Sequence, residues 1–288
     1  MPGRNWLRRY IFAPNRHMAV QAALVAAGIG VILLNVQRLS PAEWRHAPAG
    51  TAGLTAISFN ILLGGQPAGS ALDAIEAADP DIVCLQEMTP ELAKMFEARL
   101  GKLFPHRYFK PGQMTQGVGI ASRHKLSGGK VLTLGLTYLP AVSATVQTQA
   151  GPIRVACVHL MPPLARFNKS VNIWDRYWRN QAIRVGQAEH LLRHLEDYDM
   201  PAIVLGDMNE WPGQAAGAVL AKAGFRDPCN APGRHCGPTW PGQTLYWPAT
   251  FRIDHILGRG INFTDAAVLE AGGSDHYPVA ARFRPVAN

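Results

Sequence analysis

Six short apolar segments of this chain each end at, or contain, polar residues that can carry chemistry, and no other feature restricts the fold as strongly. Runs of four to eight β-branched or aliphatic residues are typical of buried strands. An ionisable side chain at the end of such a strand is costly to bury unless it is paired or bound to a metal ion. The repetition therefore predicts one shared site at the ends of sheet strands. The polar residues concerned are Asn60, Gln86, Glu87, His159, Asp207, Asn209, Asp254, His255, Ser274, Asp275 and His276.

Helical and strand-like segments alternate in the first half of the chain, and the second half adds strands and loops. The predicted strands are 54–59, 81–85, 117–122, 131–136, 141–149, 153–158, 202–205, 252–257 and 277–283. The predicted helices are 70–78, 90–100, 181–195 and 215–223. We therefore expect an α/β (α+β) fold in which two sheets face each other and helices cover their outer sides. A chain of 288 residues with 48% hydrophobic composition can bury such a core in one catalytic domain.

The N-terminal part differs from the rest because it contains an apolar run of 19 residues, Met18–Val36, in which only Gln21 and Asn35 are clearly polar. About 20 such residues are needed to cross the core of a bilayer. Four arginines precede the run, and this excess of positive charge predicts that the N-terminal side stays in the cytoplasm. The expected organisation is a basic cytoplasmic leader (1–17), a transmembrane signal anchor (18–36), a linker (37–52) and a catalytic domain (53–288).

Two other interpretations of the apolar run are a cleaved signal peptide and a buried core helix. The run is longer than the ~7–15 apolar residues of a signal peptide, and no small-residue cleavage site follows it closely. A core helix would not normally follow an arginine-rich leader. We therefore expect a single-pass protein of the inner or plasma membrane whose catalytic domain is extracytoplasmic, that is, periplasmic.

The net charge of +8 belongs mostly to the N-terminal part. Six basic residues and one acidic residue lie in residues 1–46, which gives this part a charge of +5 and leaves +3 for the rest. Proteins that bind nucleic acid normally concentrate Lys and Arg along the binding groove. The charge therefore gives little support to a nucleic-acid substrate.

The four cysteines fall into two pairs with different surroundings. Cys84 and Cys157 lie in the middle of predicted strands, where they are most simply small buried apolar residues. Cys229 and Cys236 flank a loop rich in Pro, Gly and Asn, and an extracytoplasmic location would permit a disulfide between them. Reduced thiols, or a metal site with the adjacent His235, are the alternatives to this favoured disulfide.

The residue types at the predicted site point to a divalent metal. Carboxylate and amide oxygens suit a hard cation such as Mg²⁺ or Mn²⁺, and added histidines suit phosphate-ester hydrolysis. Glu87 is the best candidate for the main metal ligand, assisted by Asn60, because it ends a buried strand well before the next helix. Asp207 and Asn209 lie two residues apart on a segment expected to be extended, so their side chains should point the same way.

The ordered motifs resemble the endonuclease/exonuclease/phosphatase superfamily, which includes DNase I-like nucleases, abasic-site endonucleases, bacterial sphingomyelinases and inositol-polyphosphate 5-phosphatases. The resemblance covers about residues 53–285, and six motifs in this order are a stronger sign than any one of them. It implies a four-layer sandwich of two packed, mainly antiparallel sheets flanked by helices, with a divalent metal, usually Mg²⁺, at one end. The motifs are Asn60, Gln86-Glu87, His159, Gly206-Asp207-Met208-Asn209, Arg252-Ile253-Asp254 and Ser274-Asp275-His276.

The resemblance also implies roles for individual residues. Asp207 would orient or deprotonate the attacking water, and Asn209 would hold a phosphoryl oxygen. Asp254 would orient His276, an imidazole that can serve as base, acid or cationic clamp, while Asp275 faces the metal region. Whether His276 or Asp207 is the base stays open.

Three further residues belong to these motifs or lie next to them. His159 stands where DNase I-type nucleases and sphingomyelinases carry a second histidine, so the resemblance implies that it protonates the leaving oxygen. His255 is expected to point away from Asp254 and to be structural. Arg252 either braces the site or binds phosphate.

The segment 161–180 bears on the substrate because it interleaves aromatic and basic residues directly after His159. Such a segment would suit stacking on nucleic-acid bases or insertion into a lipid headgroup layer. Alternatively, Trp174 and Trp178, four residues apart, pack one helical face on the core. The predicted partner is therefore a phosphoester that is a lipid headgroup, a nucleotide or a nucleic acid.

Together these features predict a membrane-anchored, divalent-metal-dependent phosphoester hydrolase, a phosphodiesterase or phosphatase, that is a monomer. The alternative enzyme is a metal-dependent endo- or exonuclease acting on DNA or RNA. A catalytically inactive relative that serves as a binding module is a third hypothesis, and the intact motifs argue against it.

Overall fold

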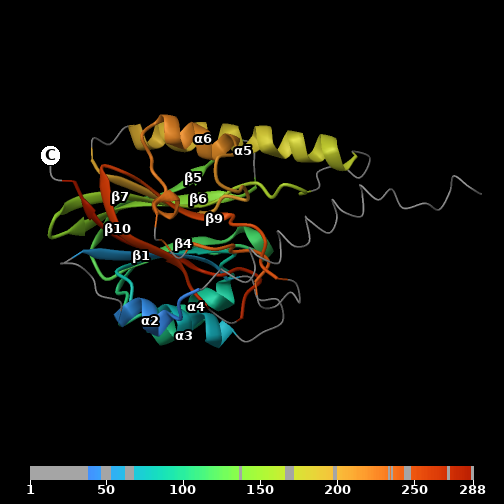
Figure 1. Ribbon diagram of the computed structural model, residues 1–288. Helices are drawn as coiled ribbons and strands as arrows, with labels where there is room; N and C mark the ends of the chain where they lie inside the picture. The colour runs from blue at the N-terminus through green and yellow to red at the C-terminus, as the bar shows by residue number, and fades with distance from the viewer. Residues whose placement is uncertain are drawn as a thin grey trace, which may run out of the picture. The chain divides into compact units, whose positions relative to one another are not determined.

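Two β-sheets lie face to face in the part of the protein that follows Gln37, and helices cover the outer face of each sheet (Figure 1). The computed structural model describes residues 38–46, 53–61, 68–135, 138–165, 172–196, 200–232, 234, 236–242, 248–270 and 273–286. Residues 38–288 form one compact unit. The predicted leader and transmembrane anchor lie outside the described residues. Within those ranges, no helix combines the length and the apolar character needed to cross a membrane.

The first sheet has six strands in the order β10-β11-β1-β2-β4-β3. Only β1 and β2 are parallel neighbours, and the other pairs are antiparallel. The strands are β1 (Leu54–Asn60), β2 (Ile82–Gln86), β3 (His106–Lys110), β4 (Val118–Ser122), β10 (Ile261–Val268) and β11 (Val279–Pro285).

The second sheet has five strands in the order β5-β6-β7-β8-β9. Again one neighbouring pair, β7 and β8, is parallel. In each sheet this parallel pair brings two strand ends to the same edge. The strands are β5 (Leu126–Thr133), β6 (Pro140–Thr148), β7 (Gly151–His159), β8 (Ala202–Asp207) and β9 (Asp254–Arg259).

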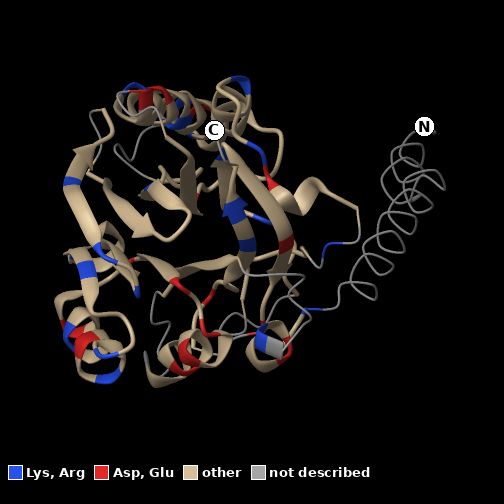
Figure 2. Ribbon diagram, turned by 90° about the vertical axis from the view of Figure 1, so that its left-hand side faces the viewer, with Lys and Arg blue, Asp and Glu red and all other residues tan. Residues whose placement is uncertain are grey.

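The helices make the two outer layers of the sandwich. The helices α2 (Pro41–His46), α3 (Ala68–Ala78) and α4 (Pro90–Leu100) cover the first sheet, and α5 (Ile173–Glu196) and α6 (Ala215–Lys222) cover the second. Figure 2, which views the domain along the strands, shows the same four layers, with charged residues spread over both helical layers. The predicted α/β sandwich of two mainly antiparallel sheets is confirmed.

The central strands read as continuous apolar runs because both of their faces are buried. In β2, Val83 and Leu85 pack on the helices of the first sheet, whereas Ile82 and Cys84 face the second sheet. The following helix α4 begins at Pro90 because the side chain of Thr89 accepts a hydrogen bond from Leu92 N, and it buries residues spaced four apart.

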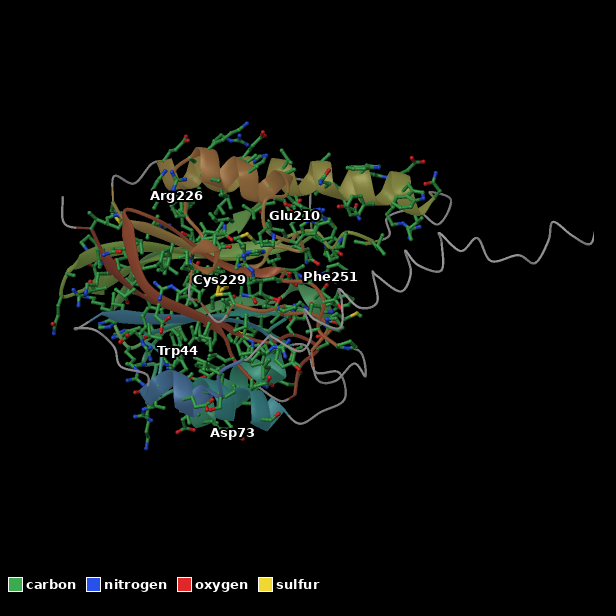
Figure 3. All side chains as sticks on the ribbon, viewed as in Figure 1. Trp44, Asp73, Glu210, Arg226, Cys229 and Phe251 are labelled. Carbon is green, nitrogen blue, oxygen red and sulfur yellow. A yellow bond between two sulfur atoms is a disulfide. The ribbon has the colours of Figure 1, made fainter. Side chains whose placement is uncertain are left out.

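The predicted linker over residues 37–52 is wrong in part. Pro41–His46 form the helix α2, and Trp44 is completely buried in the core between this helix and the first sheet (Figure 3). The guanidinium carbon of Arg282 lies 4.0 Å from the centre of the Trp44 ring. The domain therefore begins at Arg38. Local composition did not reveal this, because the proline of a first helical turn looks like a linker proline.

Four other elements differ from the predicted ones. β3 and β10 were not predicted, because they are not continuous buried runs. The residues of β3 are half-buried up to the exposed Lys110, and β10 alternates between half-buried and exposed positions before its last three residues, which are buried. β5 begins at Leu126 rather than at residue 131. α5 begins at Ile173 rather than at residue 181, so the aromatic and basic segment after His159 contributes the first turns of a long helix.

The prediction for Cys84 and Cys157 is wrong, because these residues form a disulfide between β2 and β7. The bond therefore links the two sheets through the apolar layer between them. Their Cα atoms are 5.5 Å apart. The pairing depends on how the two sheets pack, and each cysteine alone looks like an ordinary buried residue in the sequence.

Candidate active site

The alternation of side chains along each strand decides which groups can enter a common site. In β8, Ile203 and Leu205 face the first sheet, so Asp207, two residues further, points into the same space. The same alternation directs Asn60, His159 and Asp254 toward the space between the sheets. The residues next to these in each strand, such as His255, point to the opposite face of the sheet, away from the space between the sheets.

The register of the strands then places these residues side by side. Asn60 pairs with Gln86 in the first sheet, while His159 and Asp254 both pair with Asp207 in the second. Glu87 follows the end of β2 in a left-handed conformation, with a φ of 59°, and the residue is 7% exposed. The chain turns sharply at this residue, which brings its carboxylate back to the strand ends.

The amide of Asn60 connects the acidic groups of the two sheets. Its Nδ2 atom donates hydrogen bonds to Glu87 Oε1 and to Asp207 Oδ2, each at 3.1 Å. Asn60 itself is held by its carbonyl oxygen, which accepts a hydrogen bond from Ser274 Oγ at 2.7 Å. All of these groups are buried. One amide therefore fixes two carboxylates that are far apart in the sequence.

Two histidines complete the cluster. His276 Nδ1 lies 2.8 Å from Asp254 Oδ2, and its Nε2 lies 3.8 Å from Asp207 Oδ2. His159 Nε2 lies 3.6 Å from the same oxygen of Asp207 and 3.9 Å from Glu87 Oε1. The other nitrogen of His159 is 3.1 Å from the carbonyl oxygen of Thr115, in the 3-10 helix η1 (Met114–Gln116). Both imidazoles thus turn Nε2 toward the carboxylates.

Burial separates the proton affinities of these groups. It raises the pKa of Asp207 to about 7, and the charge of Asp254 adds to this effect. Burial alone would lower the pKa of His276, but the charges of Asp254 and Asp207 outweigh it and raise this pKa to about 10. The pKa of Glu87 is raised by burial, and that of His159 is lowered by burial. The site therefore combines a charged imidazole, a neutral imidazole and a carboxyl group that titrates near neutral pH.

Several donor atoms fit a divalent cation. Within the described residues, Glu87 Oε2 and Asp275 Oδ1 are buried and have no hydrogen-bond partner. Ligand atoms of Asp207, Asp254 and His276 lie within 4.8 Å of one another. We favour Glu87, Asn60 and Asp275 as the metal position, because Asp254 and His276 already bind each other. Hard oxygen donors of this kind suit Mg²⁺.

The structure brings together Asn60, Glu87, His159, Asp207, Asp254 and His276 from the predicted set. The expectation of an extended segment at Asn209 is wrong, because this residue has a φ of 51°. Its Nδ2 donates to the carbonyl oxygen of Leu160 at 3.0 Å, and its backbone N–H donates to Asp207 Oδ1 at 2.8 Å. Asn209 therefore also holds the loop after β7 and the carboxylate of Asp207 in place.

Some supporting residues escaped the sequence analysis. Thr239 Oγ1 accepts hydrogen bonds from the backbone N–H groups of Ile253 and Asp254, at 3.0 and 3.2 Å. Arg184 forms a buried ion pair with Glu210 at 2.8 Å and donates to the carbonyl oxygen of Met161. Thr239 in a loop and Arg184 in a helix have no local sequence pattern that marks them. The one signal for the ion pair is Glu210, an acidic residue directly after Asn209.

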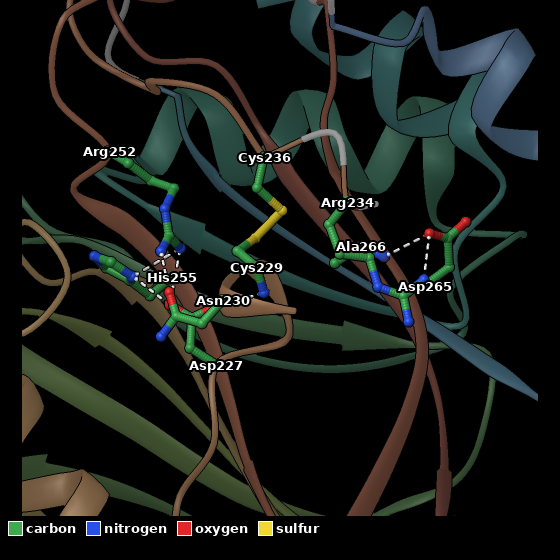
Figure 4. The surroundings of a disulfide bond; sticks show 9 residues. All are labelled: Asp227, Cys229, Asn230, Arg234, Cys236, Arg252, His255, Asp265 and Ala266. Carbon is green, nitrogen blue, oxygen red and sulfur yellow. Dashed lines mark hydrogen bonds and ion pairs between the residues drawn. A yellow bond between two sulfur atoms is a disulfide. The ribbon is translucent and has the colours of Figure 1, made fainter. Parts of the chain in front are cut away.

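Behind the site, on the outer side of β9, lies a second polar cluster (Figure 4). Asp227 Oδ2 accepts a hydrogen bond from Arg252 Nη1 at 2.8 Å and lies 3.2 Å from His255 Nδ1. His255 Nε2 is 2.8 Å from the carbonyl oxygen of Glu210. His255 therefore points away from Asp254, as predicted, and Arg252 binds Asp227 beside it.

A disulfide between Cys229 and Cys236 closes the loop next to this cluster (Figure 4). Cys229 N donates to Asp227 Oδ1 at 2.9 Å, and Asn230 Oδ1 accepts from Arg252 at 3.2 Å. The bond is the one expected from the loop composition. It holds the loop that contacts Arg252.

Replacement of Asp227 by Asn is expected to lower the free energy of unfolding by about 2 kcal/mol at pH 7, because hydrogen bonds to a charged, buried partner are lost. Burial alone would raise the pKa of Asp227, but His255 and Arg252 outweigh it and hold the pKa below its usual value of 3.8. The folded state therefore prefers the carboxylate. Its stabilisation is complete above the unfolded pKa and is lost as the pH falls through the folded pKa.

Urea unfolding of both proteins from pH 7 down to pH 3 measures this effect. The difference between wild type and D227N should shrink at the acid end. The control is D73N, which removes an exposed ion pair with Arg99 and should change stability by less than about 1 kcal/mol. An equal loss in D73N, or a difference that does not vary with pH, would contradict the role assigned to Asp227.

The fold and the site define a class of protein: a metal-dependent hydrolase of phosphoric esters built on a two-sheet sandwich. Residues 57–276 match the sequence profile of the Endonuclease/Exonuclease/phosphatase family. The chain therefore belongs to this family, since the match spans most of its length. No curated protein sequence matches the chain.

Solved structures agree with this fold. An endonuclease/exonuclease/phosphatase from Beutenbergia cavernae DSM 12333 is 22% identical, with 82% of this chain and 72% of that chain covered and a TM-score of 0.59. TDP2 from D. rerio, complexed with a single-strand DNA product, is 19% identical, with 81% and 100% covered and a TM-score of 0.63. The 3' phosphatase NExo from Neisseria, bound to a product DNA hairpin, is 19% identical, with 80% and 99% covered and a TM-score of 0.63.

Proposed function

We propose that this protein is a membrane-anchored hydrolase of phosphoesters, a phosphodiesterase or a phosphatase, that uses Mg²⁺ or Mn²⁺. The observation that carries the proposal is the amide of Asn60, which holds Glu87 of one sheet and Asp207 of the other at 3.1 Å each. Two buried carboxylates kept this close favour the binding of a divalent cation at the site.

Glu87, Asn60 and Asp275 would hold the ion. Glu87 and Asp275 each have a buried carboxylate oxygen without a hydrogen-bond partner among the described residues, and ligation would satisfy both. Asn60 would contribute its side-chain oxygen Oδ1, because its Nδ2 donates to the carboxylates of Glu87 and Asp207. A bound divalent ion supplies charge to a phosphoryl oxygen and makes a water more acidic.

The other residues would move and hold protons. Asp207, with a pKa of about 7, can accept the proton of the attacking water. His276 remains protonated, because its pKa is about 10, and its Nε2–H can hold a phosphoryl oxygen. Asp254 keeps this ring in position through Nδ1. Asp207 is therefore a better base than His276.

His159 faces the cluster from the side of η1. Burial lowers its pKa, so the ring is neutral near pH 7, with Nδ1–H donating to the carbonyl oxygen of Thr115. Its role as donor to the leaving oxygen requires that Nε2 first takes up a proton. Glu87 and Asp207, at 3.9 and 3.6 Å, are placed to stabilise that proton.

Activity of the purified full chain on a panel of substrates tests the proposal. The panel contains bis-p-nitrophenyl phosphate, plasmid DNA, sphingomyelin and inositol phosphates, each with Mg²⁺, with Mn²⁺ and with EDTA. We expect metal-dependent release of product from at least one small or lipid phosphoester. Absence of hydrolysis across the panel with either metal would refute the proposal.

A nuclease acting on DNA or RNA is the second candidate. It is supported by two proteins of similar fold whose structures contain DNA products, TDP2 and NExo. The charge of +3 outside residues 1–46 argues against a long nucleic-acid groove. In the panel, cleavage of plasmid DNA without turnover of sphingomyelin or inositol phosphates would favour this candidate.

The anchored state is proposed from the apolar run of 19 residues, Met18–Val36, and the arginines before it. We propose that the run crosses the inner or plasma membrane once. The catalytic domain then lies on the extracytoplasmic, periplasmic side. An oxidising compartment agrees with two disulfides, Cys84–Cys157 and Cys229–Cys236.

A reporter fused after Asn288 tests this topology. Alkaline phosphatase, which needs an oxidising compartment, should be active in the fusion, and a fluorescent protein that folds only in the cytoplasm should be dark. The control is a fusion after Arg16, before the apolar run, for which the two results should be reversed. Cytoplasmic fluorescence of the Asn288 fusion would overturn the anchored topology.

A further inference from the structure

Exposed large apolar side chains gather at the end of the domain that holds the site. The described residues contain twelve such side chains, and six of them lie on the loop after β7, at the start of α5, and on the loops that flank β8 and β9. We call these six the apolar rim. Its members are Leu164, Ile173, Trp174, Trp178, Trp211 and Phe251.

The rim is close to the catalytic residues along the chain. Leu164 follows His159 by five residues, Trp211 follows Asp207 by four, and Phe251 precedes Asp254 by three. Trp211 and Phe251 stack with their ring centres 5.7 Å apart. Figure 3 shows Phe251 toward the end at which α5 begins, and Arg226 toward the other end. The rim residues are therefore close in sequence to the catalytic residues, and Phe251 lies toward the end of the domain at which α5 begins.

The tryptophans of α5 do not serve the core. Trp174 is 71% exposed and Trp178 is 59% exposed, so the interpretation that they pack one helical face on the core is wrong. The buried face of α5 is made by other residues, including Ala188, Leu191 and Leu195. Large exposed apolar patches usually mark an interaction surface, and tryptophan is enriched where proteins meet the headgroup layer of a membrane.

The start of α5 is attached firmly to the site. Asn180 Nδ2 donates to the carbonyl oxygens of Pro162, Pro163 and Ala165, which belong to the loop after His159. The hydroxyl of Tyr177 accepts a hydrogen bond from Gln214 Nε2 at 2.9 Å, near the start of α6. A surface that binds at the rim would therefore be held at a fixed position relative to the catalytic cluster.

The chain enters the domain at this same end. Arg38 Nη2 donates to the carbonyl oxygen of Pro238 at 3.2 Å, and its guanidinium carbon lies 3.9 Å from the centre of the Tyr277 ring, next to His276. Val36, the last residue of the apolar run, precedes Arg38 by two residues. Two residues span at most about 7 Å.

We propose that the apolar rim inserts into the headgroup layer of a lipid bilayer, so that the site acts on phosphoesters at the membrane surface. The proposal rests on the membrane-anchored hydrolase function given above. Only two positions of sequence separate the end of the proposed anchor from Arg38, and among the described residues the rim is the largest group of exposed apolar side chains. Arg176 lies between the two tryptophans and Arg179 follows Trp178, and basic side chains suit anionic headgroups.

Site-specific labelling of the full chain in vesicles tests the proposal. All four cysteines are paired, so W178C introduces the only free thiol, and the same holds for the control L103C. Leu103 is also an exposed apolar residue, 38% exposed, but it follows the far end of α4. Each variant is labelled with NBD in vesicles of phosphatidylcholine and phosphatidylglycerol, with and without doxyl-labelled lipid.

We expect NBD at position 178 to emit at shorter wavelength and to be quenched by doxyl lipid several-fold more than NBD at position 103. Equal quenching at both positions would overturn the proposal. A change at position 178 on addition of single-stranded DNA, without quenching by doxyl lipid, would also overturn it and would identify the rim as a nucleic-acid surface. Hydrolysis of bis-p-nitrophenyl phosphate in the same samples reports on the catalytic function separately.

A second measurement uses the unlabelled double variant W174Q/W178Q. We expect kcat/KM for a vesicle-borne phosphoester to fall roughly tenfold, because two apolar side chains no longer enter the bilayer. Turnover of the small soluble ester should be unchanged, since neither tryptophan belongs to the catalytic cluster. Equal losses on both substrates, or no loss on either, would overturn the proposal. If the wild type itself did not hydrolyse the soluble ester, this result would instead count against the hydrolase function.

Discussion

Glu87→Gln is expected to reduce metal-dependent hydrolysis of bis-p-nitrophenyl phosphate by roughly 1,000-fold or more. The glutamine keeps the size of the side chain and its contact with Asn60, but it removes the negative charge that would hold the cation. Glu87 Oε2 is buried and has no hydrogen-bond partner among the described residues, so a bound cation would satisfy it. Steady-state kinetics over a range of Mg²⁺ concentrations measure the loss, and calorimetric titration with Mn²⁺ measures metal binding directly.

The stability of the same variant separates a catalytic loss from a folding defect. Burial raises the pKa of Glu87, which means that the folded protein disfavours its charge when no metal is present. E87Q removes this penalty, so its urea unfolding midpoint without metal should be at least that of the wild type. The matched control is E91Q, an exposed acid in the first turn of α4, which should keep full activity. Wild-type turnover or wild-type Mn²⁺ affinity in E87Q would exclude Glu87 as the main ligand.

The second large effect is expected for His276. H276A should lower kcat by roughly 1,000-fold, since a charged imidazole placed to hold a phosphoryl oxygen would be lost. D254N should lower kcat less, by roughly 10- to 100-fold, because Asp254 acts on the substrate only by orienting and charging the ring of His276. We expect the smaller loss for D254N because Asp254 Oδ2 contacts His276 Nδ1, at 2.8 Å, rather than the substrate. Single-turnover kinetics of both variants at saturating Mg²⁺ measure it.

His124 provides the control for these variants. It is also a histidine paired with a carboxylate, Asp81, at 3.3 Å, but the pair is partly exposed and lies at the opposite end of β2. H124A should retain kcat within about twofold, as expected for a change away from the site. If D254N lost more activity than H276A, Asp254 would have to contact the substrate itself, and the assignment of the pair would be wrong.

The strand ends could be predicted from local features of the sequence. Each run of β-branched residues is buried on both faces, and the polar residue that follows it falls at the sheet edge. Because side chains along a strand alternate between its two faces, the sequence also predicted that His255 points away from Asp254. These features depend on covalent geometry over two to eight residues.

Other features required the packing of the whole domain. Trp44 belongs to a segment with the composition of a linker, and only the core against α3 and the first sheet explains its burial. Cys84 and Cys157 form a disulfide because β2 and β7 belong to facing sheets. Thr239 supports Asp254 from a loop with no pattern of its own. Each case joins residues whose separation along the chain carries no information about their distance in space.

The sequence by itself therefore determined which chemical groups end the strands, which side of each strand they occupy, and which family the chain belongs to. The tertiary structure decided which of these groups meet. Asn60 reaches Asp207 across 147 positions of sequence because the apolar faces of two sheets pack together and bring their edges into line. The same packing left Trp174 and Trp178 outside the core, although their spacing is that of a buried helical face. Burial depends on the partner surface that a helix meets, and that partner is set by the fold.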